Sequence, residues 1–106
     1  MIKIGFFAIG AGISADPEII KLIARNCEAS GYHSLWAPEH IVLLDQYSST
    51  YPYTQNGRMP FETLQIDILD PFLALTFAAA VTSTIRLGTG ICLVPERQPL
   101  PLAKEV

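Results

Sequence analysis

The sequence predicts a parallel α/β fold, and three observations support this prediction. Short apolar runs alternate with helical segments in the order strand, helix, strand, helix, strand, and the chain ends just inside another helix. The predicted strands are almost continuously hydrophobic, as strands buried on both faces are. Half of the 106 residues are hydrophobic, 16% are charged and the formal net charge is −3, which indicates a folded core. Periodicity alone does not separate a closed barrel from an open doubly wound sheet.

The first strand is predicted at residues 2–9, and the glycine-containing turn GAGIS follows at residues 10–14. The first predicted helix has both ends marked in the sequence. Asp16 fits the N-cap, Pro17 fits the first helical position, and Gly31 fits the left-handed residue that follows a helix. Between these marks, five apolar residues share one face and predict core packing: Ile19, Ile20, Ile23, Ala24 and Cys27.

The second strand is predicted at residues 32–38, so that Glu39 and His40 follow its carboxyl end, while His33 lies at its start and is expected on the surface. Residues 42–68 have no sustained periodicity and contain three tyrosines, Tyr47, Tyr51 and Tyr53. A loop of this length is more often functional or mobile than a simple connection.

The second helix is predicted at residues 72–82, because Asp70 and Pro71 repeat the cap-and-proline signature. The third strand is predicted at residues 85–94, with Gly88 and Gly90 inside it. Glycine inside a strand marks a bulge or a close approach of the backbone to a ligand, such as a flat cofactor ring. A bend that serves packing explains the same glycines equally well, and both interpretations stay open.

Ligands of parallel sheets gather at the carboxyl ends of the strands, which directs attention to three places. The turn after the first strand is not a dinucleotide fingerprint, because Ser14 and Ala15 occupy the region of the third glycine, so permissive backbone is favoured over a phosphate site. Glu39 and His40 could orient a substrate, bind a metal or transfer protons, or they could be ordinary satisfied polar residues. The third place is the segment from Gly90 to Arg97, which follows the third strand.

Several classes of function are disfavoured by composition. The mildly acidic chain has no basic patch, which argues against nucleic acid as a partner. Cys27 and Cys92 fit neither a zinc pattern nor a disulfide framework and are interpreted as reduced core thiols. The sequence contains no signal-peptide pattern and no apolar run of roughly 20 residues, so we expect a cytoplasmic protein without a membrane partner.

Three segments carry a family likeness: SLWAPEH at residues 34–40, DPFLALTFAAAVTSTIRLGTG at residues 70–90 and RLGTGICLVPERQPLPLAKEV at residues 86–106. Together they resemble the opening third of luciferase-like monooxygenases and their relatives that depend on the deazaflavin coenzyme F420. The resemblance implies a (β/α)8 TIM barrel. A complete barrel needs about 250 residues. We therefore expect residues 1–106 to be the N-terminal part of a single barrel domain, about three βα units long and truncated at the start of the third helix.

The resemblance also implies a cofactor, F420 or alternatively FMN, at the carboxyl end of the barrel. Its ring would lie against a bulge in the third strand that contains a non-proline cis peptide, which by position is Gly90–Ile91. His40 is implied as a proton donor or polariser beside the ring, and Glu39 as its neighbour that contacts the cofactor or shapes the site. The expected catalytic residues are thus His40 and Glu39, the expected cofactor contacts are these two with Gly90 and Ile91, and no metal is expected.

From this likeness we expect an oxidoreductase that transfers hydride between F420 or FMN and a small organic substrate, or a monooxygenase if oxygen participates. A homo-oligomer is expected. Two departures from the family are Gln98, where asparagine is frequent, and Pro101, where an aliphatic residue is frequent. Later loops are expected to hold the cofactor tail, so the 106 residues are not expected to catalyse a reaction alone. The alternatives are a non-catalytic flavin-binding homologue, an inactive truncated fragment, or a metal-dependent hydrolase that uses Glu39 and His40.

Overall fold

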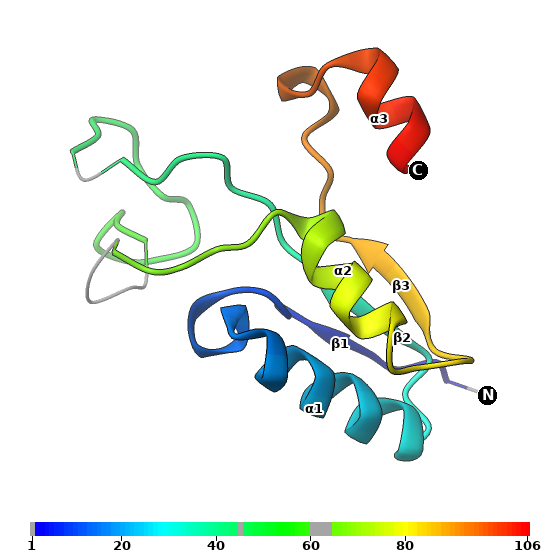
Figure 1. Ribbon diagram of the computed structural model, residues 1–106. Coiled ribbons are helices and arrows are strands. Elements are labelled where there is room, and N and C mark those ends of the chain that lie inside the picture. The colour runs from blue at the N-terminus through cyan, green and yellow to red at the C-terminus, as the bar shows by residue number, and fades with distance from the viewer. Residues whose placement is uncertain (1, 45, 60–64) are drawn as a thin grey trace.

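The computed structural model describes residues 2–44, 46–59 and 65–106. They contain a three-stranded parallel sheet, in which the strand order is β1-β2-β3 (Figure 1). This confirms the predicted parallel α/β arrangement. The elements are β1 (Gly5–Phe7), η1 (Gly12–Ala15), α1 (Pro17–Ala29), β2 (Ser34–Ala37), α2 (Pro71–Ala79), β3 (Arg86–Thr89), η2 (Val94–Glu96) and α3 (Pro99–Glu105).

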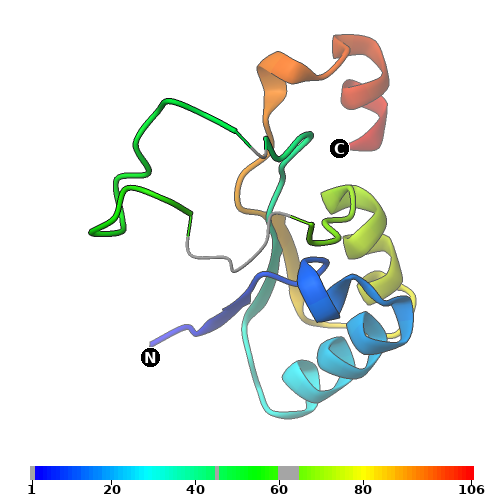
Figure 2. The ribbon, with the colours of Figure 1, turned by 90° about the vertical axis from the view of Figure 1, so that its left-hand side faces the viewer.

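Helices α1 and α2 cover one face of the sheet, and the long loop before α2 runs on the other side (Figure 2). The strand register places Leu35 of β2 between Phe6 of β1 and Leu87 of β3. Leu35 and Ala37 are buried, whereas Trp36 between them is 40% exposed. Because successive side chains of a strand point to opposite faces, the helices bury one face and leave the side of Trp36 open.

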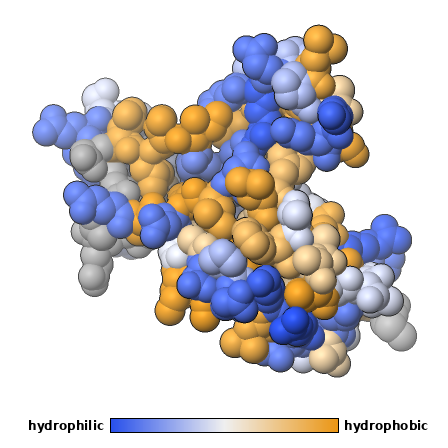
Figure 3. Space-filling view, in the orientation of Figure 1, coloured by the Kyte–Doolittle hydropathy of each residue, from blue (hydrophilic) through white to orange (hydrophobic). Residues whose placement is uncertain are grey.

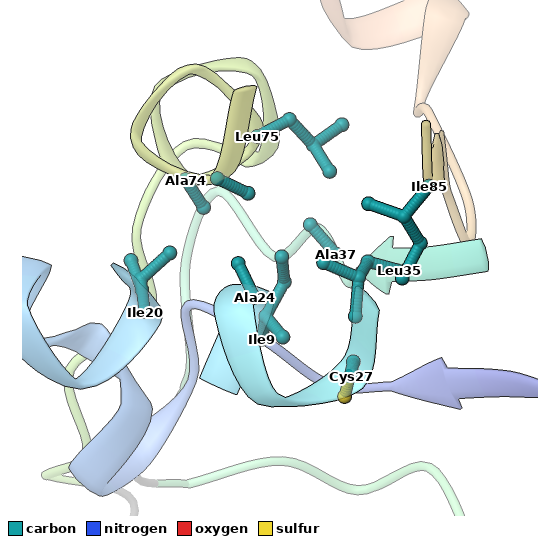
Figure 4. Packing of buried hydrophobic residues seen from close by; sticks show 10 residues of the cluster. Ile9, Ile20, Ala24, Cys27, Leu35, Ala37, Ala74, Leu75 and Ile85 are labelled. Atoms are coloured by element: carbon teal, nitrogen blue, oxygen red, sulfur yellow. The ribbon is translucent and has the colours of Figure 1, made fainter. Parts of the chain in front are cut away.

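The hydrophobic core lies between this sheet and the two helices (Figure 4). Of the five residues predicted on the apolar face of α1, Ile20, Ala24 and Cys27 belong to the core and Ile23 packs against it, whereas the half-buried Ile19 is not part of the cluster. Burial raises the pKa of the Cys27 thiol, and the thiol is free, as is that of the half-buried Cys92. The buried cluster consists of Ile9, Ile20, Ala24, Cys27, Leu35, Ala37, Ala74, Leu75, Ala78 and Ile85.

The predicted helix caps are confirmed. Asp16 Oδ1 accepts the N–H groups of Glu18 at 2.7 Å and Ile19 at 3.2 Å, and Asp70 Oδ1 accepts those of Phe72 at 2.9 Å and Leu73 at 3.3 Å. Each cap satisfies N–H groups that have no partner within the helix. Gly31 follows α1 with φ +78°, the left-handed conformation expected there.

The third strand is shorter than predicted, because β3 ends at Thr89 and not at Val94. Its only partner strand in the described chain, β2, ends at Ala37, and the N–H of Gly90 donates to the carbonyl of Ala37 at 2.8 Å. Beyond this bond the chain leaves the sheet and reaches the short helix η2. The strands β1 and β2 are likewise shorter than their apolar runs, because hydrophobicity continues past the residues that pair.

Two further predictions need correction. Helix α2 ends at Ala79, three residues early, and the hydroxyl of Thr82 donates to the carbonyl of Ala78 at 2.8 Å in a closing turn. His33 was expected on the surface and is half-buried. Its N–H donates to Ile4 O at 2.8 Å and its carbonyl accepts from Arg86 N at 3.1 Å, so its backbone pairs with a segment on each side.

Candidate functional site

A cavity of about 630 Å³ opens where the three strands end. Each strand contributes the residues that follow it, and the loop before α2 adds a further wall. Almost all of its lining is apolar, and no Lys or Arg is among the described residues that line it. The lining comprises Phe7, Ala8, Ala11, Gly12, Pro38, Glu39, His40, Tyr51, Met59, Ile66, Ile68, Gly90, Ile91 and Leu93.

The wall after β1 is a bulge held by a buried serine. Ala8 has φ +72°, and its N–H and that of Ile9 both donate to the carbonyl of Trp36, at 3.0 and 3.2 Å. Two residues thus oppose one on the partner strand, as in a β-bulge. Ser14 Oγ lies 3.0 Å from Ala8 O and accepts the N–H of Ala11 at 3.2 Å. The serine therefore fixes the turn that carries the cavity wall.

The same turn pairs with the end of the long loop. The N–H of Gly12 donates to Asp67 O at 2.8 Å, and the N–H of Leu69 donates to Gly10 O at 2.9 Å. Gly10 has φ +84°, and a Cβ there would lie 2.7 Å from the Cβ of Ala74. The glycine therefore serves a turn packed against α2. Asp16 and Asp67 line the hollow beside this turn, which disfavours a phosphate there.

The two glycines of the third predicted strand have different roles. A Cβ at Gly88 would lie 2.7 Å from Cζ3 of Trp36, so this glycine makes room for the indole and not for a ligand. Gly90 lines the cavity and is joined to Ile91 by a cis peptide bond, in agreement with the expectation from the resemblance. A Cβ at Gly90 would lie 3.0 Å from Cε2 of Phe7. Any side chain at Gly90 would therefore crowd the cavity.

His40 is exposed and lies where three hollows meet. It lines the main cavity, a smaller recess of about 250 Å³ formed by the loop after β2, and a third hollow toward Pro71. Tyr51 and Met59 line both the main cavity and the recess. The imidazole can therefore reach a molecule in either space.

Glu39, by contrast, is buried and engaged in hydrogen bonds. Its Oε2 accepts the N–H of Leu93 at 2.5 Å, and its Oε1 accepts Nε of Arg97 at 2.7 Å and is also contacted by Arg97 Nη2. The exposed fraction of the Glu39 side chain is 3%. Because both oxygens already have partners, this carboxylate is poorly placed to ligate a metal ion. No group of three metal-ligating side chains occurs among the residues that the structure describes.

The structure therefore gathers Glu39, His40, Gly90 and Ile91 around one cavity. Sequence reasoning gave no structural role to Ser14 or Ala8, nor to Arg97 at the end of the segment after the third strand, although all three shape the same walls. A buried glutamate predicts a cationic partner in general, and the sequence placed Arg97 after the third strand without pairing it with Glu39. No helix among the described residues has both the length and the apolar character needed to cross a bilayer.

A model of the luciferase-like monooxygenase family matches residues 5–106, nearly the whole chain. The chain belongs to this family. It is 35% identical over 83 residues to "Uncharacterized protein Rv0953c" of Mycobacterium tuberculosis and to "Uncharacterized protein Mb0978c" of Mycobacterium bovis. It is 30% identical over 83 residues to "Uncharacterized protein Rv0940c" of M. tuberculosis.

Each of these matches covers 78% of this chain, but only 29% of the first two relatives and 28% of the third. The chain thus corresponds to less than a third of the length of these relatives. No solved structure gives a significant match to it.

Proposed function

We propose that this luciferase-like chain provides one wall of the active site of an oxidoreductase that uses F420, or alternatively FMN. The observation that carries the proposal is the apolar cavity at the carboxyl ends of all three strands, lined by His40 and by the bare backbone of Gly90. A parallel sheet with helices on one face and a site at this end is the arrangement of a TIM barrel, of which residues 1–106 would form the first part.

A tricyclic flavin or deazaflavin ring fits the residues of the cavity. The lining is mostly apolar, Gly90 presents backbone without a side chain, and Ile91, which also lines the cavity, is 65% exposed. When bound, such a ring supplies hydride transfer, and the protein contributes position and electrostatics. His40 holds or releases a proton beside the reacting atoms, and Glu39 shapes the wall. Without a Lys or Arg in the described lining, the cavity suits the ring better than the phosphate tail.

The smaller recess suits an uncharged, apolar substrate. Val42 and Leu44 line it and are 68% and 61% exposed, and apolar residues gather along this loop in Figure 3. The loop is tied internally, because Tyr47 Oη accepts the N–H of Met59 at 3.0 Å and Arg58 stacks on the Tyr47 ring. His40 is the only ionisable group other than tyrosine among the described residues of the recess. Apart from a protonated His40, a charged substrate would find no counter-charge among these residues.

Titration of a full-length barrel protein that contains residues 1–106 with F420 and with FMN, followed by cofactor fluorescence, tests the proposal. We expect one of the two to bind, and we expect Gly90→Val to abolish binding because its side chain would enter the cavity. Val94→Ala is the matched control, since Val94 follows on the same segment and is 57% exposed outside the cavity lining. Absence of binding for both cofactors would refute the proposal.

The role of His40 is tested in the full-length barrel protein by turnover with menadione, an uncharged apolar electron acceptor, and the reduced form of whichever cofactor binds. His40→Ala is expected to lower the rate about a hundredfold while the cofactor dissociation constant stays unchanged. Loss of a positioned proton donor acts on the chemical step and leaves the apolar contacts of the ring intact. An unchanged rate would remove His40 from the reaction. Binding without turnover in the unsubstituted protein would favour a non-catalytic flavin-binding homologue.

A further inference from the structure

One guanidinium group joins three separate parts of the chain behind the cavity. Arg97 Nε donates to Glu39 after β2, its Nη2 donates to Asp70 Oδ2 at 2.6 Å at the start of α2, and its Nη1 lies 3.6 Å from Glu105 of α3. The guanidinium also stacks over the Phe72 ring at 4.8 Å from its centroid. The Arg97 side chain is only 14% exposed.

Both carboxylate oxygens of Glu39 and both of Asp70 accept hydrogen bonds. Asp70 caps α2 with Oδ1 and accepts Arg97 with Oδ2, while Glu39 accepts Leu93 N–H with Oε2 and Arg97 with Oε1. Hydrogen bonds to Glu39 and then Asp70 raise the pKa of Arg97 above its ordinary value, so it stays charged. A buried carboxylate without such a partner would carry a large desolvation penalty.

Leu93 connects this network to the cavity. The cavity wall runs from Gly90 to Leu93, and its last N–H is held by Glu39, the residue directly before His40. The chain has left the sheet at this point, since the bond between Gly90 N and Ala37 O is the last to β2. The Glu39 carboxylate therefore anchors the far end of the wall, and Arg97 holds that carboxylate.

We propose that Arg97 is a positioning residue, which acts through Glu39 to hold the Gly90–Leu93 wall and His40 at the separation that the cofactor ring requires. Lysine cannot replace it fully, because only a planar guanidinium reaches two carboxylates and stacks on Phe72 at once. The effect on the cofactor rests on the proposed function, whereas the effect on the wall does not.

The test compares Arg97→Gln and Arg97→Lys with Arg86→Gln. Arg86 is exposed and begins β3 at the end away from the cavity. The first readout is amide hydrogen exchange at Leu93, with the Ile20 amide of α1, bonded to Asp16 O at 3.0 Å, as internal reference. In Arg97→Gln we expect the Leu93 amide to exchange about tenfold faster than in the unsubstituted protein while Ile20 stays unchanged, with Arg97→Lys in between.

The second readout is the dissociation constant of F420 or FMN, expected to rise about tenfold in Arg97→Gln and to be partly restored in Arg97→Lys. Equal acceleration at Leu93 and Ile20 would mean a merely structural role and would overturn the inference, as would unchanged exchange at Leu93 or unchanged cofactor affinity. If the unsubstituted protein binds neither cofactor, the proposed function fails, and Leu93 exchange still decides whether Arg97 holds the wall. If Arg97→Gln does not fold, Leu93 exchange and the cofactor dissociation constant are both measured on Arg97→Lys.

Discussion

The indole of Trp36 occupies space that two glycines on neighbouring strands leave open. A Cβ at Gly5 would lie 2.9 Å from its Nε1, and a Cβ at Gly88 would lie 2.7 Å from its Cζ3. The indole N–H donates to Ser34 Oγ at 2.9 Å, which fixes the ring across the strands. Gly88 was predicted as either a ligand contact or a packing feature, and the position of this single side chain favours packing.

Gly88→Ala is therefore expected to destabilise the fold by about 1 kcal/mol, since the new methyl group would force the half-exposed ring to move. Trp36 is the only tryptophan in the sequence, so its fluorescence reports on that movement directly. We expect a shifted emission maximum together with a lower midpoint in urea. Arg86→Ala, two residues earlier on the same strand, should leave both unchanged. An unshifted emission spectrum in Gly88→Ala would contradict the steric argument.

At the scale of elements, one carboxylate links the end of α1 to the connection between α2 and β3. Glu28 Oε1 accepts the N–H groups of Ser83, Thr84 and Ile85, at 2.9, 2.6 and 3.0 Å. These bonds, those to Thr84 and Ile85 foremost, lower the pKa of Glu28 to about 2 from an ordinary value of 4.5. The two sides of the contact are more than 50 residues apart in the sequence, and no sequence motif predicts it.

Because the pKa of Glu28 is lower in the folded state than in the unfolded state, its contribution to stability is complete above about pH 4.5 and is lost as the pH falls toward 2. Glu28→Gln should consequently lower the thermal midpoint at pH 7, and the difference from the unsubstituted protein should shrink between pH 4.5 and 2. Thermal unfolding followed by circular dichroism at several pH values measures this. Glu18→Gln, which removes an exposed ion pair with Lys21, is the matched control. A difference that does not depend on pH would exclude stabilisation by the charged Glu28 carboxylate.

At the scale of the whole molecule, the described chain has one hydrophobic core, shared by α1, α2 and the sheet. Ile20 is a fully buried member of this core, whereas Leu22 on the same helix is 54% exposed. The site residues lie outside this core, at the ends of the strands. The core therefore sets the direction of the strands, and the loops that follow them build the cavity.

Ile20→Ala is expected to destabilise the protein by about 2 to 5 kcal/mol, because it removes buried contacts that α1 makes with the shared core. Leu22→Ala should cost far less. With a single core, urea unfolding followed by far-ultraviolet circular dichroism and by Trp36 fluorescence should give coincident transitions. Two separated transitions would show that the sheet and the helices unfold independently.

The sequence by itself determined the order of elements, the caps at Asp16 and Asp70, the turn at Gly31 and the buried stripe of α1. All of these depend on residues within a few positions of one another, and local propensity and periodicity report such contacts. Together with the family likeness, the sequence also pointed to Glu39, His40, Gly90 and Ile91, which line one cavity, although their catalytic and binding roles stay predictions.

Only the tertiary structure decided where β3 stops, what Gly88 accommodates and which group holds Glu39. A strand ends where its partner strand ends. Strand β3 stops pairing at the level of Ala37, the last residue of β2, although the apolar residues of the sequence continue beyond this point. The partner of Glu39 is 58 positions away, at Arg97, so the bond exists only after the sheet and helices have brought the two segments together. Local sequence rules describe neighbours along the chain, whereas the walls of this cavity are made of neighbours in space.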